Sequence, residues 1–535
     1  MHGLGESIRA VDMAADLADF SPARTGARDP APADGASASR LRPGLYFWIA
    51  GLIVYGLAAL NFAGGHFLDQ TSRDLWQHLA ALRALIADPF DPSNPFVPTG
   101  EGSRHFHPYW VAVAFVARAF GWNEWQAIAF AGFASGGVLL AGIWAFARSF
   151  YRNAWGPLAL LAAMVLGWSL PISHTGYHSV QTYIEGIAYP ASLLIGLSLL
   201  LWALIIRTLE RPVRALLVVP LAAFMFATHQ LGAGIGFMAA GCFILLWPKG
   251  SLKARAAAAG AIAAGLLLAT AWPHHSPFEA IARTGNPSWT GGLEFYSAKL
   301  LFMAGVPALI GLWGLCHPRF ARDSRPVLLA FVGFAAIFAA GAYGPMIATR
   351  FVMPAVLMLH VGMGALFIVL GEKWRSMRKA SQLGLFGFAV ACFNIHVAAT
   401  VAHLNWEAGV SRETGDAHAA AQALTADIPD AEPVAAYDVA AWPVVATGQR
   451  AVSVPWPEPM IADLAERQAA AERLFNPKLS REERLGLARQ WGVRRLIIDR
   501  RGPIRRLMPD GLLKVLDEQA ASRRESGTFI RFDLE

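Results

Sequence analysis

The chain has 535 residues, of which 55% are hydrophobic and 16% are charged, with a formal net charge of +7. Soluble globular domains carry roughly 25% charged residues, so this composition excludes an ordinary soluble protein. The positive charge is not gathered with aromatic residues into a patch, which excludes a nucleic-acid partner. The three cysteines are far apart in the sequence, and their spacing predicts neither a disulfide framework nor a zinc site.

The first part of the chain, residues 1–42, is rich in Ala, Asp, Pro, Ser and Arg. It contains no apolar run followed by a cleavage site, as a signal peptide would. Its low hydrophobicity predicts a disordered segment. We expect a disordered cytoplasmic tail.

A series of apolar segments follows. Their length, about 17–25 residues, is the length that crosses the hydrocarbon core of a bilayer, and we expect about eleven spans. They lie near residues 44–64, 123–147, 156–173, 187–206, 213–230, 232–248, 255–272, 298–315, 326–343, 351–371 and 382–403. The predicted fold is mainly α, a polytopic transmembrane helical bundle over residues 43–404.

Lys and Arg gather in every second short connection between these segments. The basic connections are residues 147–153, 205–214, 248–255, 317–326 and 372–380. Cytoplasmic loops carry the excess of Lys and Arg, so these connections are predicted to face the cytoplasm. An odd number of spans then places the C-terminal part outside, in the periplasm of a Gram-negative cell. We therefore expect a multi-pass protein of the inner membrane that contacts membrane lipids, with its N-terminus in the cytoplasm.

The first predicted outer loop, residues 65–122, holds two carboxylates, Asp69 and Asp74, just after the first span. A carboxylate here can act as a general base or bind a divalent cation, and the sequence does not decide whether a metal is needed. Residues 75–87 carry an apolar stripe that predicts an amphipathic helix at the membrane interface. Asp74 can also simply cap this helix. His78 follows one turn later, where it can contact a phosphate or serve as a buried structural histidine.

A second polar group in this loop is the sequence Ser103–Trp110, which brings together Arg104, His105 and His107. These side chains can hold a phosphate through charge-assisted hydrogen bonds. Equally, they can anchor the chain among lipid headgroups. The aromatic pair that follows predicts a position at the membrane interface, where Tyr and Trp are enriched.

Further ionisable residues lie at the outer ends of other spans, which predicts a polar cavity open to the outer face. They are His174, His178, Glu185, His229, His274, His275, Glu279 and Arg350. Arg350 is distinctive because it lies on the side where positive charge is otherwise scarce. It can hold a lipid-linked phosphate or bind ordinary headgroups.

The last part of the chain, residues 405–535, changes character. Short apolar stretches alternate with helical patterns, which predicts a small extracytoplasmic α/β domain. Strands are expected at 435–439, 451–454, 494–499 and 529–532, and helices at 461–475, 481–491 and 512–519.

Several signatures are absent: the sequence contains no P-loop, dinucleotide fingerprint, HExxH or G-x-S-x-G motif. The sequence resembles the GT-C class of membrane glycosyltransferases, related to the dolichyl-phosphate-mannose mannosyltransferase-like enzymes. The resemblance is carried by TSRDLWQH, HFHPYW, THQLGAGIGF and RFVMP, and by a tail containing ATGQRAVSVPWPEP and LARQWGVRRLIIDR. The acidic motif of the first outer loop departs from the class, because residues 65–122 contain no adjacent Asp-Glu or Asp-x-Asp pair.

The resemblance implies a sugar donor linked to polyprenyl phosphate and an acceptor that is a glycan, a lipid or a protein. It implies that Asp74 is the base, with Asp69 as the alternative, and that Arg350 holds the carrier phosphate. Two other classes stay open: a multi-span transporter, and a non-catalytic component of an envelope glycan assembly. A transporter favours interrupted spans and charges at the membrane midplane. A scaffold would tolerate substitutions at the outer polar residues.

Overall fold

The computed structural model describes residues 42–63, 74–168, 178–284, 307–343, 346–379, 381–384, 387, 398, 417–430, 432–455, 458–500 and 509–535. The predicted tail up to residue 41 lies outside these ranges, as do Asp69, His174 and most of the expected span at 382–403. The domain boundaries drawn from the sequence therefore stay predictions.

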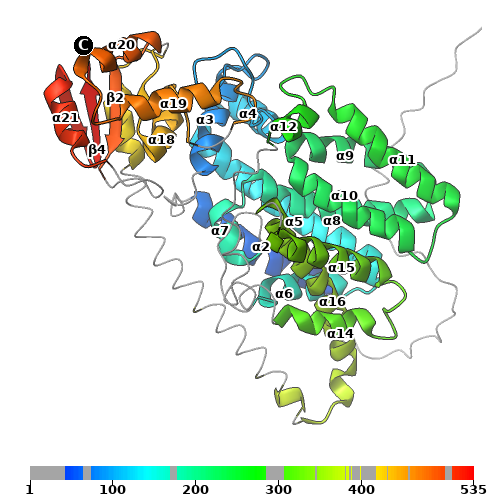
Figure 1. Ribbon diagram of the computed structural model, residues 1–535. Coiled ribbons are helices and arrows are strands. Elements are labelled where there is room, and N and C mark those ends of the chain that lie inside the picture. Colours follow the sequence, from blue (N-terminus) through cyan, green and yellow to red (C-terminus); the bar gives the residue numbers. More distant parts are fainter. Residues whose placement is uncertain are drawn as a thin grey trace, which may run out of the picture. The chain divides into compact units, whose positions relative to one another are not determined.

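Most of the described chain is helical (Figure 1). Among the described residues, five helices are long and apolar enough to cross a membrane: α2 (Pro43–Ala63), α5 (Glu124–Tyr151), α8 (Pro190–Glu210), α11 (Leu252–Ala269) and α16 (Val352–Lys373). Shorter apolar helices are α4 (Pro108–Phe120), α6 (Gly156–Leu166), α9 (Ala215–Thr228), α10 (Gln230–Leu246) and α15 (Arg325–Ala340). This is a multi-pass membrane protein with a mainly α fold, as the apolar pattern predicts.

The remaining helices of this part are short. They are α3 (Asp74–Ala87), α7 (Val180–Gly186), α12 (Pro277–Thr284) and α14 (Gly311–Cys316). Helix α4 lies inside the segment that we predicted as an outer loop. This helix is apolar, but its 13 residues are too few to cross a bilayer, so the criterion of apolar length does not predict it.

Glycines let several of these helices approach closely. Helix α14 packs against α16, and a Cβ on Gly314 would overlap the carbonyl oxygen of Gly362. Helix α5 packs against α8 in the same manner, with Gly142 against the carbonyl oxygen of Gly196. Small residues at such crossings are typical of membrane helices, whose association depends on van der Waals contact.

We predict that Gly314→Ala destabilises the protein, because the added methyl group forces α14 and α16 apart. Overpacking of this kind costs roughly 1–3 kcal/mol, so the thermal midpoint in detergent should fall by several degrees. Gly333→Ala on α15 is the matched control, since a Cβ there meets no described atom within 4 Å. Equal midpoints for the two variants would contradict the close crossing.

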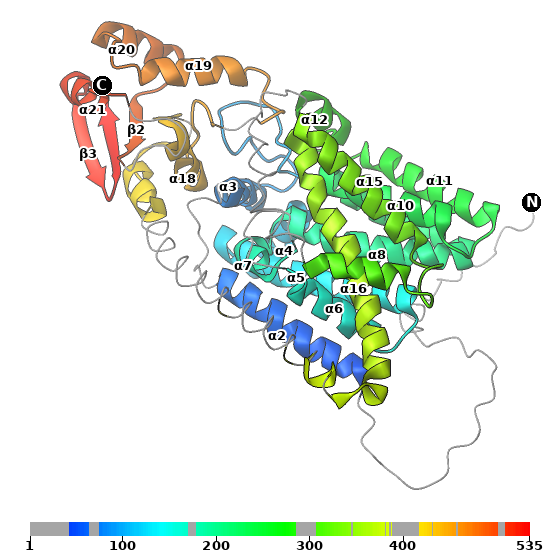
Figure 2. The same ribbon diagram turned by 60° about the horizontal axis from the view of Figure 1, so that its bottom comes forward.

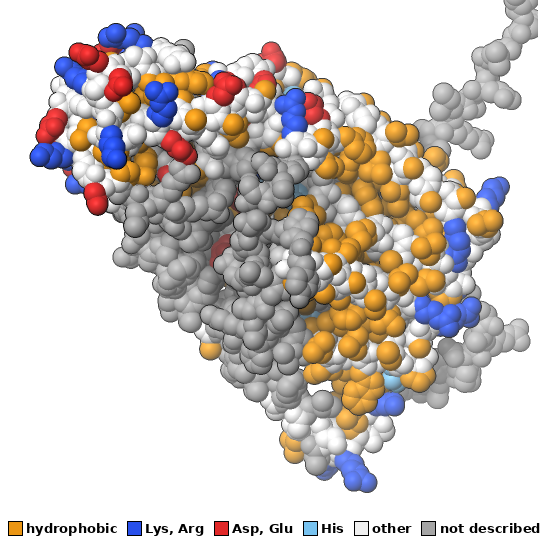
Figure 3. All heavy atoms as spheres, viewed as in Figure 1, with side chains coloured by type: hydrophobic (Ala, Val, Ile, Leu, Met, Phe, Trp, Pro, Cys, Tyr) orange, Lys and Arg blue, Asp and Glu red, His pale blue; other side chains and the backbone are white. Residues whose placement is uncertain are grey.

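The basic connections meet at one end of the helices (Figure 2). Glu210 pairs with Arg152 at 3.5 Å and with Lys249 at 3.6 Å. Asn153 donates a hydrogen bond to Glu372 at 3.1 Å. Glu372 also pairs with Arg319. All five connections predicted to share a face are therefore linked to one another. In the face seen in Figure 3, hydrophobic side chains cover the helices, whereas charged side chains gather on the C-terminal elements and at the helix ends.

The C-terminal elements form a small four-stranded sheet in the order β1 (Ala435–Ala436), β2 (Arg495–Asp499), β4 (Phe529–Asp533), β3 (Ser522–Ser526). Strand β1 is parallel to β2, and the other two pairs are antiparallel. The helices are α18 (Ala441–Ala446), α19 (Leu464–Leu474), α20 (Arg481–Gln490) and α21 (Leu512–Gln519). A separate hydrophobic core, which includes Leu496 and Phe532, holds this unit together.

This sheet departs from the predicted strands at two places. Strand β3, with the sequence SRRES, was not expected, because an edge strand whose first four residues are exposed lacks apolar alternation. The expected strand at 451–454 is wrong: only Ala451 forms a bridge, to Val434.

Candidate functional site

Helix α3 begins at Asp74 and carries the first group of candidate residues. Most of the predicted apolar stripe is buried, and so is His78 on the same face, but Trp76, Gln77 and Ala80 on other faces are buried as well. The reason is that α3 packs against α4, α5 and the C-terminal helix α18, and is thus covered by protein on several sides. The helix is therefore enclosed by protein, and its position at the membrane interface stays a prediction. Asp74 itself is exposed, one turn before His78.

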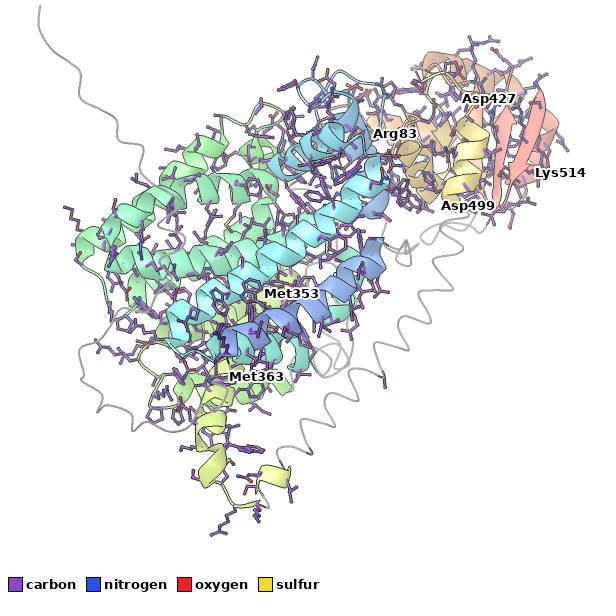
Figure 4. The ribbon with its side chains drawn as sticks, turned by 180° about the vertical axis from the view of Figure 1, so that it is seen from behind. Arg83, Met353, Met363, Asp427, Asp499 and Lys514 are labelled. Carbon is purple, nitrogen blue, oxygen red and sulfur yellow. The ribbon has the colours of Figure 1, made fainter. Side chains whose placement is uncertain are left out.

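The C-terminal elements contact the first outer segment through main-chain and side-chain groups. The amide of Ala451 donates to the carbonyl oxygen of Phe96 at 2.8 Å. Arg83, labelled in Figure 4 beside the C-terminal elements, packs against Gly448 so closely that a Cβ there would lie 2.9 Å from its Nε. Gly448 also has a φ of 96°, which favours glycine.

The sequence HFHPYW forms the start of helix α4. His107 caps the helix, its Nδ1 accepting from the amide of Trp110 at 3.3 Å, and Pro108 occupies the first turn. Trp110 in turn donates its Nε1–H to Nδ1 of His78 at 3.1 Å. Tyr109 and Trp110 are 5% and 0% exposed, so both rings lie in the protein core. The position of this pair at the membrane interface stays a prediction.

Around this helix start, the structure brings most of the candidate residues together. The rings of His78 and His105 have centroids 5.5 Å apart. The charge of Arg104 acts on the rings of both His78 and His105. The charges of Arg104 and Arg350 both act on the ring of His229. Arg350 reaches this group from the 3-10 helix η5 (Met346–Phe351), directly before α16.

The segment after α11 closes the group from another side. Trp272 donates its Nε1–H to the carbonyl oxygen of Phe106 at 2.8 Å. Gly102 lies so near to His274 that a Cβ would be 2.7 Å from its carbonyl oxygen. His275 is 5% exposed, and neither of its ring nitrogens has a hydrogen-bond partner among the described residues. His274 is only partly buried and packs its ring against Phe106.

Three of the histidines are fixed in the same tautomer. Nδ1 of His78 and of His107 accepts a hydrogen bond, and Nδ1 of His229 accepts from the amide of Gly232 at 3.0 Å. A neutral imidazole that accepts at Nδ1 carries its proton on Nε2. Each ring therefore offers an Nε2–H donor. For His107, this donor has no partner among the described residues. The arrangement suits an anion that accepts hydrogen bonds.

The histidines of the outer loop are held neutral. Burial lowers the pKa of His78 from 6.5 to about 3, helped by His229 and Arg104. Burial also holds the pKa values of His105 and His107 well below the ordinary range and lowers that of His275 to about 4. Arg104 adds to the effect on His105 and His275, and neighbouring histidines add to the effect on His107. The net positive charge of this group near neutral pH therefore resides on the arginines.

We predict that acid destabilises the protein through these histidines. The pKa of His78 is 6.5 in its ordinary state and about 3 in the fold, so on acidification the unfolded chain binds the proton first. Such a histidine lowers the free energy of unfolding by about 1.4 kcal/mol per pH unit between these values. The thermal midpoint should fall from pH 7.5 to pH 5, and His78→Gln should weaken this dependence. If the thermal midpoint of His78→Gln depends on pH as steeply as that of the wild type, this prediction is contradicted.

Glu458 is the residue of this group that sequence reasoning missed. Its side chain is 3% exposed, and it comes from the C-terminal part of the chain. Oε1 accepts from the amide of Arg104 at 3.1 Å, and Oε2 lies 3.5 Å from Arg104 Nε and 3.6 Å from His105 Nε2. Burial raises the pKa of Glu458, and the positive charge of Arg104 opposes this. No local motif marks it, because its partner is 354 residues earlier.

Three other sequence candidates make different contacts. His178 forms a buried hydrogen bond of 2.7 Å with His360 on α16, and Glu185 lies on α7. Glu279, on α12, pairs with Arg283 on the same helix. Within the described ranges, no group of three or more His, Cys, Asp or Glu side chains is placed to hold a metal ion.

Solved structures share this fold. ArnT from Cupriavidus metallidurans bound to undecaprenyl phosphate aligns with a TM-score of 0.56 and 13% identity, over 92% of this chain and 98% of that chain. Its apo state aligns with a TM-score of 0.51 and 12% identity over the same shares. The arabinofuranosyltransferase AftD from Mycobacteria aligns with a TM-score of 0.52 and 14% identity, over 90% of this chain and 40% of that chain.

In sequence, no protein-family model and no curated protein matches the chain. The structural likeness extends over nearly the whole chain and includes membrane helices and the C-terminal part. The chain therefore has the GT-C fold that the sequence motifs indicated.

Proposed function

We propose that this protein is a membrane glycosyltransferase that moves a sugar from a polyprenyl-phosphate carrier to an acceptor hydroxyl. The observation that carries the proposal is the group of neutral histidine Nε2–H donors and two arginines, in which His78 lies one helical turn after Asp74. The likeness to ArnT, solved with undecaprenyl phosphate, adds support. The acceptor belongs to the glycans, lipids or proteins outside the membrane.

The proposed reaction assigns a task to each part of the site. The carboxylate of Asp74 takes the proton of the acceptor hydroxyl, whose oxygen bonds to the anomeric carbon of the sugar. The bond from that carbon to the phosphate oxygen breaks, and its electron pair leaves with the carrier phosphate. Arg350 and Arg104 stabilise the negative charge that this phosphate gains. Asp69, outside the described residues, remains the alternative base.

The histidines suit the same phosphate for a different reason. A neutral Nε2–H donor binds an anionic oxygen without adding a second positive charge to a buried site. His78, His107 and His229 are the donors proposed here, with His105, His274 and His275 lining the group. Because burial keeps these rings neutral, the charge of the site should stay constant near neutral pH.

The proposed topology puts this site on the outer face of the inner membrane. The basic connections meet at one end of the helices, as expected for the cytoplasmic side, whereas the candidate residues meet with the C-terminal elements. The N-terminus would then be cytoplasmic and the C-terminal domain periplasmic.

Carrier binding tests this function. Purified protein in nanodiscs should bind undecaprenyl phosphate in competition with membrane lipid, and should bind undecaprenol, which lacks the phosphate, at least tenfold more weakly. This selectivity follows from charge-assisted hydrogen bonds to the phosphate. Equal binding of the two compounds would contradict a phosphate site, and uptake of a solute into vesicles without sugar transfer would favour the transporter.

A further inference from the structure

We propose that Glu458 is a positioning residue that holds Arg104 and His105 for the carrier phosphate, so that the C-terminal domain completes the site rather than merely resting on it. This inference rests on the proposed function. It assigns a task to a carboxylate from a different part of the chain and to the segment that carries it, residues 458–462.

The contacts of Glu458 point to positioning. One oxygen accepts from the amide of Arg104 at 3.1 Å, and the other lies 3.5 Å from Arg104 Nε and 3.6 Å from His105 Nε2. A single buried carboxylate thereby contacts the backbone and the side chain of one residue and the ring of the next. The side chain of Arg104 is 34% exposed, so it lies between the buried carboxylate and the accessible side.

The segment of Glu458 is itself held from two directions. Glu101, in the first outer segment, accepts from the amide of Ala462 at 2.9 Å. Arg283, on α12, lies 3.4 Å from the carbonyl oxygen of Pro459 and donates to it. Three parts of the chain that are distant in sequence thus converge at residues 458–462. This bracing fixes the position of the Glu458 carboxylate.

The charge of Glu458 affects phosphate binding in two opposite ways. A phosphate that approaches from the accessible side meets a guanidinium whose Nε faces Glu458, so the cation lies between the two anions. The carboxylate repels the phosphate weakly across the cation but keeps the guanidinium in one orientation. In metal sites, removing a carboxylate that orients a ligand typically costs about 10–100-fold in affinity, and we adopt the lower end of this scale for the Arg104 contact. We therefore expect anchoring to outweigh repulsion.

The experiment is a double-mutant cycle on carrier binding by the full-length protein in nanodiscs. Glu458→Gln keeps an oxygen for the amide of Arg104 but loses the charge, and should raise the Kd for undecaprenyl phosphate about tenfold. In an Arg104→Ala background, the same change should alter the Kd less than twofold, because the group through which it acts is gone. Purely structural damage would instead be additive.

Glu466→Gln is the control: it makes the same chemical change at an exposed position on α19, outside the segment 458–462 and the residues that brace it. Its Kd should stay within twofold of wild type. If Glu458→Gln does not fold, Glu458→Asp replaces it, since it keeps the charge but withdraws the carboxylate from Arg104. Thermal midpoints identify misfolded variants.

The outcomes separate this inference from the function on which it rests. Wild-type protein that binds no undecaprenyl phosphate overturns the proposed function, and the inference with it. Wild-type binding together with additive effects in the cycle, with tighter binding by Glu458→Gln, or with an equal loss in Glu466→Gln overturns the positioning role alone.

Discussion

Replacing Asp74 by Asn should lower the turnover number by about 10²–10⁴-fold, because the amide cannot accept the proton of the acceptor hydroxyl. Asn has nearly the shape of Asp, so the KM for the lipid-linked donor should change little. The measurement is the rate of sugar transfer by purified protein at saturating donor, with the donor KM determined in parallel. The effect should be the largest of any single substitution in this chain.

The same substitution separates catalysis from capping. Asn caps a helix about as well as Asp, so a carboxylate that only caps α3 would be replaced without loss of stability or turnover. Asp88→Asn, just after the other end of α3, is the control, since Asp88 accepts only from the amides of Phe90 and Asp91 within the described residues. Full activity of Asp74→Asn would shift the base to Asp69 or refute base catalysis here.

Replacing Arg350 by Ala should lower kcat/KM for the donor by about 10–150-fold, the equivalent of losing roughly 1.5–3 kcal/mol of hydrogen bonding to a charged group. Part of the loss should appear in kcat, because the carrier phosphate gains negative charge as it leaves. Arg350→Lys should recover only part of the activity, since an ammonium group lacks the planar paired donors of a guanidinium. Steady-state kinetics with purified protein measure both constants.

The control for Arg350 lies at the opposite end of the helices. Arg319 pairs with Glu372 among the basic connections, so Arg319→Ala changes the overall charge equally without touching the candidate site. Its kcat/KM should match that of the wild type. If both variants lose activity to the same extent, general charge or lipid anchoring explains the result, and the phosphate-holding role of Arg350 is refuted.

The membrane helices could be predicted from the sequence because their signal is local. Apolar length alone places α2, α5 and α8 to within a few residues of their observed ends. Helix α4 was missed for the same reason, since 13 residues are too few for the criterion. The burial of α3, Tyr109 and Trp110 by other parts of the chain was not predicted, because amphipathicity does not distinguish a headgroup layer from a covering domain.

The candidate site could be predicted only in part. Asp74, Arg104 and Arg350 were identified because ionisable residues near span ends are conspicuous against an apolar background. The capping contacts of His107 and His229 depend on helix ends that a sequence pattern locates poorly. Glu458 was missed because its role depends on a contact with Arg104, 354 residues earlier in the chain. Its own sequence surroundings, PWPEP, are typical of an ordinary loop.

Single-turnover transfer tests the central claim most directly. Wild-type protein in nanodiscs is mixed in excess with a panel of polyprenyl phosphates carrying radiolabelled sugars, together with a lipid and glycan extract as a source of acceptor. For at least one donor, we predict loss of the label from the carrier by the wild type, and at least tenfold slower loss by Asp74→Asn and Arg350→Ala. Equal rates of release by all three proteins, or a wild type that neither binds nor consumes any of these donors, would contradict the account.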